Sequence, residues 1–296
     1  MKVLTVDRIC KRYGKIKALD EFSLEIEAGN VFGILGPNGS GKTTLLGCIL
    51  EVLTLDSGSF LWFGGKFGDN YRNYIGAILE TPNFYPYLNA DENLKIISEI
   101  KNVTPYKFDH LLDLVGLADR RKSKFKTYSL GMKQRLAIAA TLIGDPEVLI
   151  FDEPTNGLDP SGIADVREIL LRIAGMGKTV IMSSHILDEV EKICSHVGII
   201  KNGKLLAQGH VGEILGSETF MEIGSKDADS LTAFIEKTNQ INIVQRRREI
   251  LECTVPSDFD IEAFHRELIQ HRIFINHLVI RKRRLEEEFL QILASN

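Results

Sequence analysis

The residues best suited to chemistry lie in the stretch 31–46, VFGILGPNGSGKTTLL. Residues 36–43 match the phosphate-binding pattern G-x-x-x-x-G-K-[ST], between an apolar run typical of a buried strand and one typical of a helix. Glycines let consecutive backbone N–H groups turn toward one anion without a Cβ clash. Lys42 adds a positive charge for the β- and γ-phosphates, and the Thr43 hydroxyl can ligate Mg²⁺. The stretch therefore predicts binding of a nucleoside triphosphate.

The alternative for this stretch is a glycine-rich turn that happens to precede Lys-Thr and binds nothing. A strand before the pattern and a helix after it are the flanks that a phosphate-binding loop requires, so we favour the phosphate-binding interpretation. The residues that we expect to hold the nucleotide are Gly36, Asn38, Gly39, Ser40, Gly41, Lys42, Thr43 and Thr44.

A second candidate site follows a fully apolar strand at residues 148–151, which ends in Asp152 and Glu153. Asp152 can hold the Mg²⁺ shell, and Glu153 can polarise the attacking water or accept its proton. The alternative is an acidic turn before a helix that begins at Pro160, because carboxylates favour helix starts. The phosphate-binding loop in the same chain favours nucleotide hydrolysis.

Length and composition set limits on the function. The 296 residues are 44% hydrophobic, enough for a packed core in one large domain or two smaller ones, and a net charge of −4 gives no sign of a nucleic-acid surface. The four cysteines form no C-x-x-C pair, which makes reduced cytosolic thiols the default. Apolar stretches such as residues 136–143 are far shorter than the roughly 18–20 residues of a membrane helix. We therefore expect any membrane role to come through a partner.

The elements that must position these groups alternate between strands and helices, which predicts an α/β fold. Residues 2–35 are rich in strand patterns, and apolar strands recur at residues 148–151 and 179–182. Residues 83–145 carry helical periodicity and no strand pattern, so they form a helical subdomain. We expect a mostly parallel sheet with the ligand at the carboxyl edge of its strands.

A break at about residues 209–216 divides the chain into residues 1–215 and residues 216–296. The second part follows the order β-α-β-β-α-β, which is the ferredoxin-like pattern. We expect a small α+β accessory domain there.

The ordered motifs of residues 1–215 resemble the nucleotide-binding subunit of an ABC transporter. The resemblance implies a P-loop NTPase of the ABC type, with a RecA-like core and a helical subdomain, that binds ATP and Mg²⁺. Tyr13 lies where this family stacks an aromatic ring on adenine, although a lone tyrosine in a polar loop is more often a surface residue.

Two further motifs gain meaning from this resemblance. Ser129 and Gly131, in YSLGM, resemble the family signature that caps the γ-phosphate from the opposing subunit, although Leu130 and Met132 replace a Gly and a Gln. Asp159, in GLD, resembles the loop that reaches across the dimer. On residue types alone, residues 128–135 would be an ordinary glycine-containing helix start.

The resemblance also assigns two catalytic positions. His185, in SSHILDEV, matches the switch histidine that contacts the γ-phosphate, although a lone histidine is more often structural. Glu80 lies where the family usually has a glutamine that senses Mg²⁺ and the water. A glutamate can also ligate Mg²⁺, but it adds a negative charge near the γ-phosphate.

The implied function is an ATP-hydrolysing subunit that powers an ABC transporter of the export type, resembling the bacitracin-resistance and lantibiotic-immunity branch. Its implied partners are transmembrane permease subunits on a separate chain and a second copy or a closely related ABC subunit. The implied location is peripheral, on the cytoplasmic face of a bacterial cell membrane.

Three alternatives remain at this point. An ATP-dependent sensor or regulatory ABC ATPase would bind a membrane protein without transport. Ribosome-associated relatives usually carry two motif sets, whereas this chain has one. Chromosome-maintenance ATPases insert a long coiled coil, for which the chain shows no sustained heptads.

Overall fold

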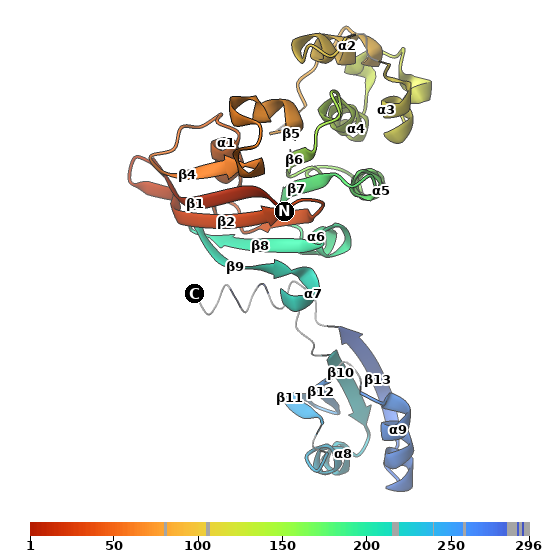
Figure 1. The fold of residues 1–296 in the computed structure, drawn as a ribbon. Helices are drawn as coiled ribbons and strands as arrows, with labels where there is room; N and C mark the ends of the chain where they lie inside the picture. The colour runs from red at the N-terminus through yellow and green to blue at the C-terminus, as the bar shows by residue number, and fades with distance from the viewer. Residues whose placement is uncertain are drawn as a thin grey trace. The chain divides into compact units, whose positions relative to one another are not determined.

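The computed structural model of the chain describes residues 1–79, 82–104, 107–214, 219–238, 240–256, 259–282, 289 and 292. By its internal contacts the chain divides into a larger unit, Met1–His210, and a smaller unit, Val211–Ser295 (Figure 1). No helix within the described residues combines the length and the apolar character needed to cross a membrane.

A six-stranded sheet in the order β5-β6-β7-β3-β8-β9 forms the centre of the larger unit. Its strands are β3 (Val31–Leu35), β5 (Ile75–Ile78), β6 (Val148–Asp152), β7 (Thr179–Ser184), β8 (His196–Lys201) and β9 (Lys204–His210). Neighbouring strands are parallel except for the antiparallel hairpin of β8 and β9. Strands β3, β6 and β7 are buried along their whole length, as parallel strands covered on both faces should be. The predicted α/β class with a mostly parallel sheet is confirmed.

A smaller antiparallel sheet in the order β2-β1-β4 lies in the same unit. Its strands are β1 (Lys2–Tyr13), β2 (Ile16–Glu27) and β4 (Ser57–Trp62). The prediction that Tyr13 lies in a polar loop is wrong, because Tyr13 ends β1 and pairs with Ile16. Only a two-residue turn separates the strands, with Gly14 at a positive φ of 59°.

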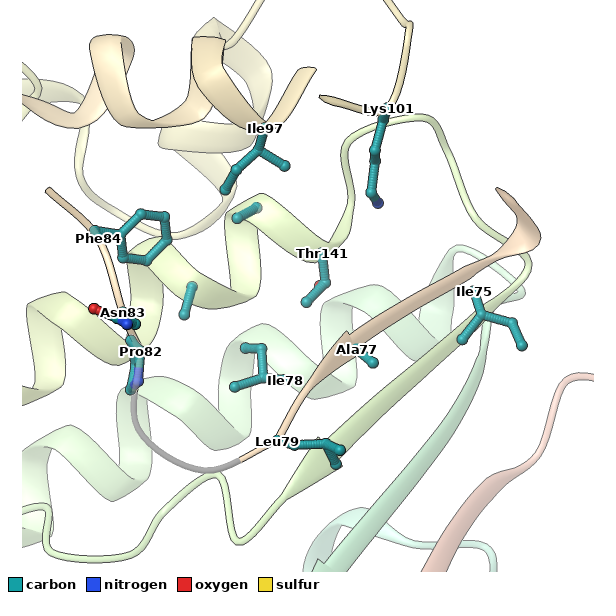
Figure 2. Close-up of a pocket in the computed structure, with 12 residues that line it drawn as sticks. Ile75, Ala77, Ile78, Leu79, Pro82, Asn83, Phe84, Ile97, Lys101 and Thr141 are labelled. Carbon is teal, nitrogen blue, oxygen red and sulfur yellow. The ribbon is translucent and has the colours of Figure 1, made fainter. Parts of the chain in front are cut away.

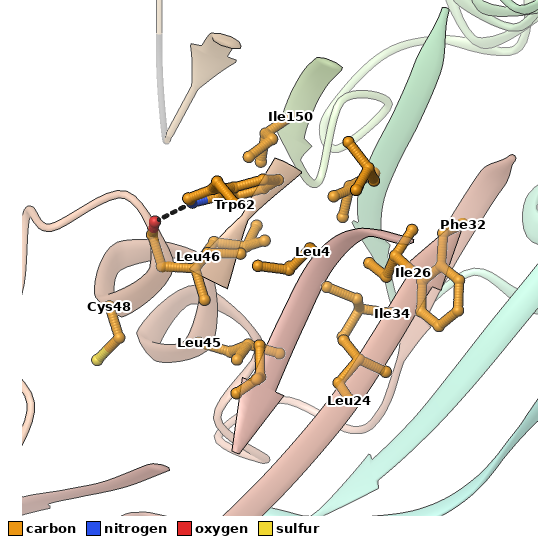
Figure 3. Packing of buried hydrophobic residues seen from close by; sticks show 14 of the residues in the cluster. Leu4, Leu24, Ile26, Phe32, Ile34, Leu45, Leu46, Cys48, Trp62 and Ile150 are labelled. Carbon is orange, nitrogen blue, oxygen red and sulfur yellow. Dashed lines mark hydrogen bonds between the residues drawn. The ribbon is translucent and has the colours of Figure 1, made fainter. Parts of the chain in front are cut away.

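One apolar core joins the two sheets to helix α1 (Lys42–Ile49), as Figure 3 shows. Phe32 and Ile34 of β3 belong to this core. Gly33 faces the opposite side, where an added Cβ would lie 2.8 Å from a methyl carbon of Val190 in α6. Trp62 closes the end of α1, because its indole N–H donates to the Ile49 carbonyl at 2.8 Å. The strand before the phosphate-binding loop and the helix after it are thus both anchored in packed structure.

Helices and short 3₁₀ turns complete the larger unit. The helices are α2 (Ala90–Ile100), α3 (Asp109–Leu114), α4 (Leu130–Thr141), α5 (Pro160–Gly175) and α6 (Leu187–Ile193). The 3₁₀ turns are η1 (Phe63–Gly65), η2 (Gly68–Tyr74), η3 (Ala118–Arg120) and η4 (Phe125–Thr127). Helix α2 begins with a capping box, in which the Asn89 side chain accepts from the Glu92 amide and the Glu92 carboxylate accepts from the Asn89 amide. Between residues 83 and 145, the described residues form helices, turns and one isolated bridge, without a strand.

The smaller unit begins with α7 (Val211–Ile214) and contains a four-stranded antiparallel sheet in the order β11-β12-β10-β13. Its other elements are β10 (Thr219–Ser225), α8 (Ala228–Ile235), β11 (Asn242–Arg247), β12 (Ile250–Val255), α9 (Ile261–Gln270) and β13 (Ile275–Lys282). The order of elements from β10 to β13 is the β-α-β-β-α-β order expected from the sequence. The predicted domain boundary between residues 215 and 216 lies outside the described residues and stays a prediction.

Candidate nucleotide site

The phosphate-binding loop leaves the carboxyl end of β3, a central strand of the main sheet. Gly41 precedes α1 with φ = 111°, and a Cβ there would lie 2.4 Å from the Ala18 carbonyl oxygen, so only glycine fits. No side chain of the described residues caps this helix. The first N–H groups of α1 are therefore available to an anion, which the helix dipole also favours.

The Lys42 amine is held inside this loop. The side chain is 6% exposed, and its Nζ donates to the Gly36 carbonyl at 2.9 Å and to the Pro37 carbonyl at 3.3 Å. The same nitrogen lies 3.4 Å from Oε1 of Glu153. A buried ammonium needs such partners, and a phosphate would supply a further negative charge to it.

Glu153 lies between two of the predicted site residues. While Oε1 faces Lys42, Oε2 lies 2.8 Å from Nδ1 of His185, the residue that follows β7 by one position. The Glu153 backbone has a φ of 48°, in the left-handed region that a non-glycine residue adopts only when its surroundings hold it there. Three segments distant in sequence therefore bring an amine, a carboxylate and an imidazole together.

Asp152 ends β6, and Ser183 lies opposite it on the parallel strand β7. The Ser183 hydroxyl donates to Oδ1 of Asp152 and accepts from the Glu153 amide at 2.9 Å. The sequence interpretation did not include Ser183. Its signal was the polar pair Ser-Ser at the end of an otherwise apolar strand, directly before His185.

A cavity of about 350 Å³ opens over the loop, a size typical of small-molecule sites. Tyr13, which is 48% exposed, and Glu153 both belong to its wall. The residues that line the cavity are Tyr13, Ile16, Ala18, Asn38, Gly39, Gly41, Lys42, Thr43, Thr44 and Glu153. Ile16 and Ala18, which lie on β2, were not among the predicted site residues.

Ser129 and Asp159 lie together in a second group, on helix starts. The Ser129 hydroxyl accepts from the Met132 amide at 3.2 Å and caps α4, and the Asp159 carboxylate accepts from the Gly162 amide at 2.9 Å and caps α5. A Cβ on Gly131 would lie 3.9 Å from the Cα of Gly162, so the two helix starts are neighbours. None of Ser129, Gly131 and Asp159 is among the described residues that line the cavity.

Comparisons with known proteins identify the family. Residues 19–156 match the ABC transporter family. The chain is also 37% identical over 302 residues to the ABC transporter ATP-binding protein YhcH of Bacillus subtilis, covering 98% of this chain and 95% of that protein. The chain belongs to the ABC transporter ATP-binding proteins.

Two relatives with named cargo align with most of this ABC protein. The lantibiotic transport ATP-binding protein SrtF of Streptococcus pyogenes is 39% identical, over 75% of this chain and 95% of that protein. The bacitracin transport ATP-binding protein BcrA of Bacillus licheniformis is 41% identical, over 70% of this chain and 69% of that protein. These relatives confirm the branch that the motifs resembled.

A solved structure agrees with this assignment. The nucleotide-free ATP-binding cassette of an ABC transporter is 26% identical, with a TM-score of 0.64 over 72% of this chain and 93% of that chain. The ABC protein described here is therefore an ATPase, the nucleotide-binding subunit that powers a transporter.

The chemistry of the side chains at this ABC site fits a nucleotide with Mg²⁺. The Thr43 hydroxyl and the Asp152 carboxylate are hard oxygen donors, and Mg²⁺ is usually bound by one or two carboxylates together with phosphate oxygens. The described residues contain no group of three or more His, Cys, Asp or Glu side chains that could hold a metal ion. The buried Ser40 hydroxyl has no hydrogen-bond partner among the described residues, as expected of a group that awaits a ligand. Glu80, the other predicted metal ligand, lies outside the described residues.

The ABC protein also has an apolar groove of about 320 Å³ between β5 and the helical subdomain (Figure 2). Its wall includes the apolar side chains of Ile78 from β5, Ile97 from α2, and Phe84 from the segment before α2. Lys101 lies at one end, where burial lowers the pKa of its amine and its Nζ donates to the Ile143 carbonyl at 2.8 Å. Among the described residues, the groove is therefore lined mainly by apolar side chains, with one lysine at its end.

Proposed function

We propose that this ATPase binds ATP at the phosphate-binding loop, hydrolyses it with Glu153 and His185, and thereby powers the export of a peptide antibiotic through a separate permease. The observation that carries the catalytic part is the Glu153 carboxylate, which lies between Lys42 and His185. The names of SrtF and BcrA support the transport part, and they favour it over a sensor that does not transport.

The proposed binding mode follows from the cavity. The triphosphate lies along the loop that includes Gly36, Asn38, Gly39, Ser40 and Gly41, because the uncapped start of α1 offers N–H donors there. The Lys42 amine turns from its loop carbonyls to the β- and γ-phosphates. The adenine stacks on Tyr13 at the wall of the cavity, and Thr44 borders the phosphates from α1.

The proposed metal ligands are the Thr43 hydroxyl and the Asp152 carboxylate. Bound Mg²⁺ would supply charge neutralisation on the β- and γ-oxygens. Glu80 stays a predicted ligand.

In the proposed hydrolysis, Glu153 orients the attacking water and accepts its proton. A base at this position typically contributes about 10²–10⁴-fold in rate. His185 then donates a hydrogen bond to the γ-phosphate, while its Nδ1 keeps Glu153 in place at 2.8 Å. Water in line with the γ-phosphate and a base within hydrogen-bond reach are the elements that phosphoryl transfer needs.

A head-to-tail pair of chains would complete each site. Ser129, Gly131 and Asp159 lie apart from the cavity of their own chain, on adjacent helix starts. In the proposed pair, these residues of one copy close over the γ-phosphate that the other copy holds. The γ-phosphate then joins the two copies, and its loss allows them to separate.

The groove in Figure 2 is the proposed contact for the permease. The groove can accept the apolar face of a helix. Part of its lining comes from the helical subdomain. The complex would then lie at the cytoplasmic face of a bacterial cell membrane. A Phe84→Asp variant should bind ATP normally but no longer co-purify with a multi-spanning chain from detergent-solubilised membranes, whereas retention of that chain would exclude the groove.

The catalytic proposal is tested with ATP and three proteins. The unmodified chain should bind ATP and release phosphate when Mg²⁺ is present. Lys42→Ala should lose ATP binding, and Glu153→Gln should bind ATP but hydrolyse it at least about 100-fold more slowly. Equal ATP affinity in Lys42→Ala, or a normal rate in Glu153→Gln, would overturn the assignment of these residues.

A further inference from the structure

Ser183 connects the Asp152 carboxylate to the Glu153 backbone through one hydroxyl. Its side chain is completely buried, at 0% exposure. The hydroxyl donates to Oδ1 of Asp152 and accepts from the backbone N–H of Glu153 at 2.9 Å. Since Asp152 and Ser183 are register partners on parallel strands, the sheet itself holds this hydroxyl beneath the point where β6 ends.

We propose that Ser183 is a positioning residue for hydrolysis, which orients the Asp152 carboxylate toward the metal and holds the Glu153 backbone in its catalytic conformation. This inference rests on the proposed roles of Asp152 and Glu153. Ser183 itself contacts neither ATP nor water in this scheme and acts through its two neighbours.

The first part of the argument concerns Asp152. A free carboxylate can rotate and present either oxygen to a metal. Ser183 occupies Oδ1, which fixes the plane of the carboxylate and leaves Oδ2 for the metal or its water. Groups that hold a metal ligand in this way usually affect metal affinity or activity by about 10- to 100-fold.

The second part concerns the Glu153 backbone. Its φ of 48° is unfavourable for a glutamate, so the surroundings must hold this conformation. The bond from the Glu153 amide to Ser183 does so directly, one residue beyond the end of β6. If this bond is lost, the backbone can relax, and the carboxylate moves away from Lys42 and His185.

The neighbouring serine has a different partner, which separates the two roles. The Ser184 hydroxyl accepts from the Ile186 amide at 2.9 Å and so holds the turn that contains His185. Ser183 thus serves the Asp152–Glu153 side of the site, and Ser184 serves the His185 side.

The test compares Ser183→Ala with Ser98→Ala. Ser98 is equally buried, at 1% exposure, and its hydroxyl donates to the Lys95 carbonyl in α2, outside the site. Ser183→Ala should lower kcat about 10- to 100-fold, raise the Mg²⁺ concentration needed for half-maximal rate, and leave ATP binding in EDTA unchanged. Ser98→Ala should change none of these, and Ser183→Thr, which keeps the hydroxyl, should recover most of the rate.

A second readout uses the protein without nucleotide or metal. Hydrogen exchange at the Glu153 amide should be faster in Ser183→Ala than in the unmodified chain or in Ser98→Ala. If Ser183→Ala does not fold, Ser183→Cys provides the test, because a thiol fills similar space but is a weak hydrogen-bond partner.

The outcomes separate this inference from the function on which it rests. An unchanged kcat and Mg²⁺ midpoint in Ser183→Ala, together with a slow Glu153→Gln enzyme, would overturn only the role of Ser183. A Glu153→Gln enzyme with the normal rate would instead overturn the proposed role of Glu153. Equal losses in Ser98→Ala and Ser183→Ala would show that Ser183 acts only on stability.

Discussion

At the scale of single residues, the site depends on charged groups that compensate one another inside the protein. Lys42 is nearly buried, yet its amine has two carbonyl oxygens and the Glu153 carboxylate within 3.4 Å. A phosphate that enters the cavity competes with Glu153 for this amine. We therefore expect nucleotide binding to exchange one carboxylate contact of Lys42 for a phosphate and to leave Glu153 free to face water.

Tyr13 should contribute to ATP affinity through its ring. Stacking on one base is worth about 1–3 kcal/mol, so Tyr13→Ala should raise the Kd for ATP about 5- to 150-fold, while Tyr13→Phe stays close to the unmodified chain. Calorimetric titration measures both. Tyr87→Ala, which removes an exposed tyrosine outside the cavity, is the control. If Tyr13→Ala weakens the binding of tripolyphosphate as much as the binding of ATP, then the Tyr13 ring does not act by stacking on adenine.

The sequence predicts the phosphate-binding loop but neither the role of Ser183 nor the position of Tyr13 on a strand, and the difference has a physical reason. The phosphate-binding loop is contiguous, and its glycines at residues 39 and 41 adopt positive φ values of 78° and 111°, a local requirement that a pattern can express. Ser183 acts across parallel strands 31 residues apart from Asp152, so its role depends on strand register. The polar neighbours of Tyr13 predict a loop, although polar residues also suit the exposed end of a strand, where the structure places it.

At the scale of elements, Trp62 joins β4 to the helix that follows the phosphate-binding loop. Its indole N–H donates to the Ile49 carbonyl in the last turn of α1, where the helix itself offers no partner (Figure 3). Trp62→Phe should lower the free energy of unfolding by about 1–3 kcal/mol, because a buried carbonyl loses its donor. Circular dichroism during urea denaturation measures this change. Tryptophan fluorescence cannot be used, because Trp62 is the only tryptophan and the substitution removes it. A ΔΔG near zero would contradict the role of this bond.

An ion pair at the start of α2 makes the helical subdomain sensitive to acid. Partial burial alone would raise the pKa of Asp91, but hydrogen bonds from Arg121 and Lys122 outweigh it and leave that pKa below its usual range. A depressed folded-state pKa stabilises the protein above the unfolded pKa of about 3.9, and this contribution is lost as the pH falls through the folded value.

Asp91→Asn should therefore lower stability by about 1 kcal/mol at pH 7, since the pair is partly exposed. Thermal midpoints from pH 7 to pH 3 measure the difference from the unmodified chain, which should shrink below about pH 4. Asp188→Asn, which removes an exposed pair with Lys192 on α6, should have a smaller effect at pH 7. A difference in thermal midpoint that stays constant down to pH 3 would contradict the link between stability and the protonation of Asp91.

At the scale of the whole molecule, the proposed head-to-tail pair determines how many chains one site needs. The elements of each chain were largely predictable, because their periodicity is local. The head-to-tail assembly is predicted only through the family resemblance, since no pattern within one chain says that its signature serves another chain. In the structure, the starts of α4 and α5 carry Ser129 and Asp159, and neither residue is among the described residues that line the nucleotide cavity.

This arrangement makes a mixing experiment decisive. Lys42→Ala damages the phosphate-binding loop, and Ser129→Arg damages the signature, so each variant alone should be inactive. In a mixed head-to-tail pair, the intact loop of the Ser129→Arg chain meets the intact Ser129 of the Lys42→Ala chain. An equal mixture should then recover about a quarter of the unmodified ATPase rate, because half the pairs are mixed and each has one complete site. If each chain built its site alone, the mixture would stay as inactive as its components, since no chain in it carries both intact parts.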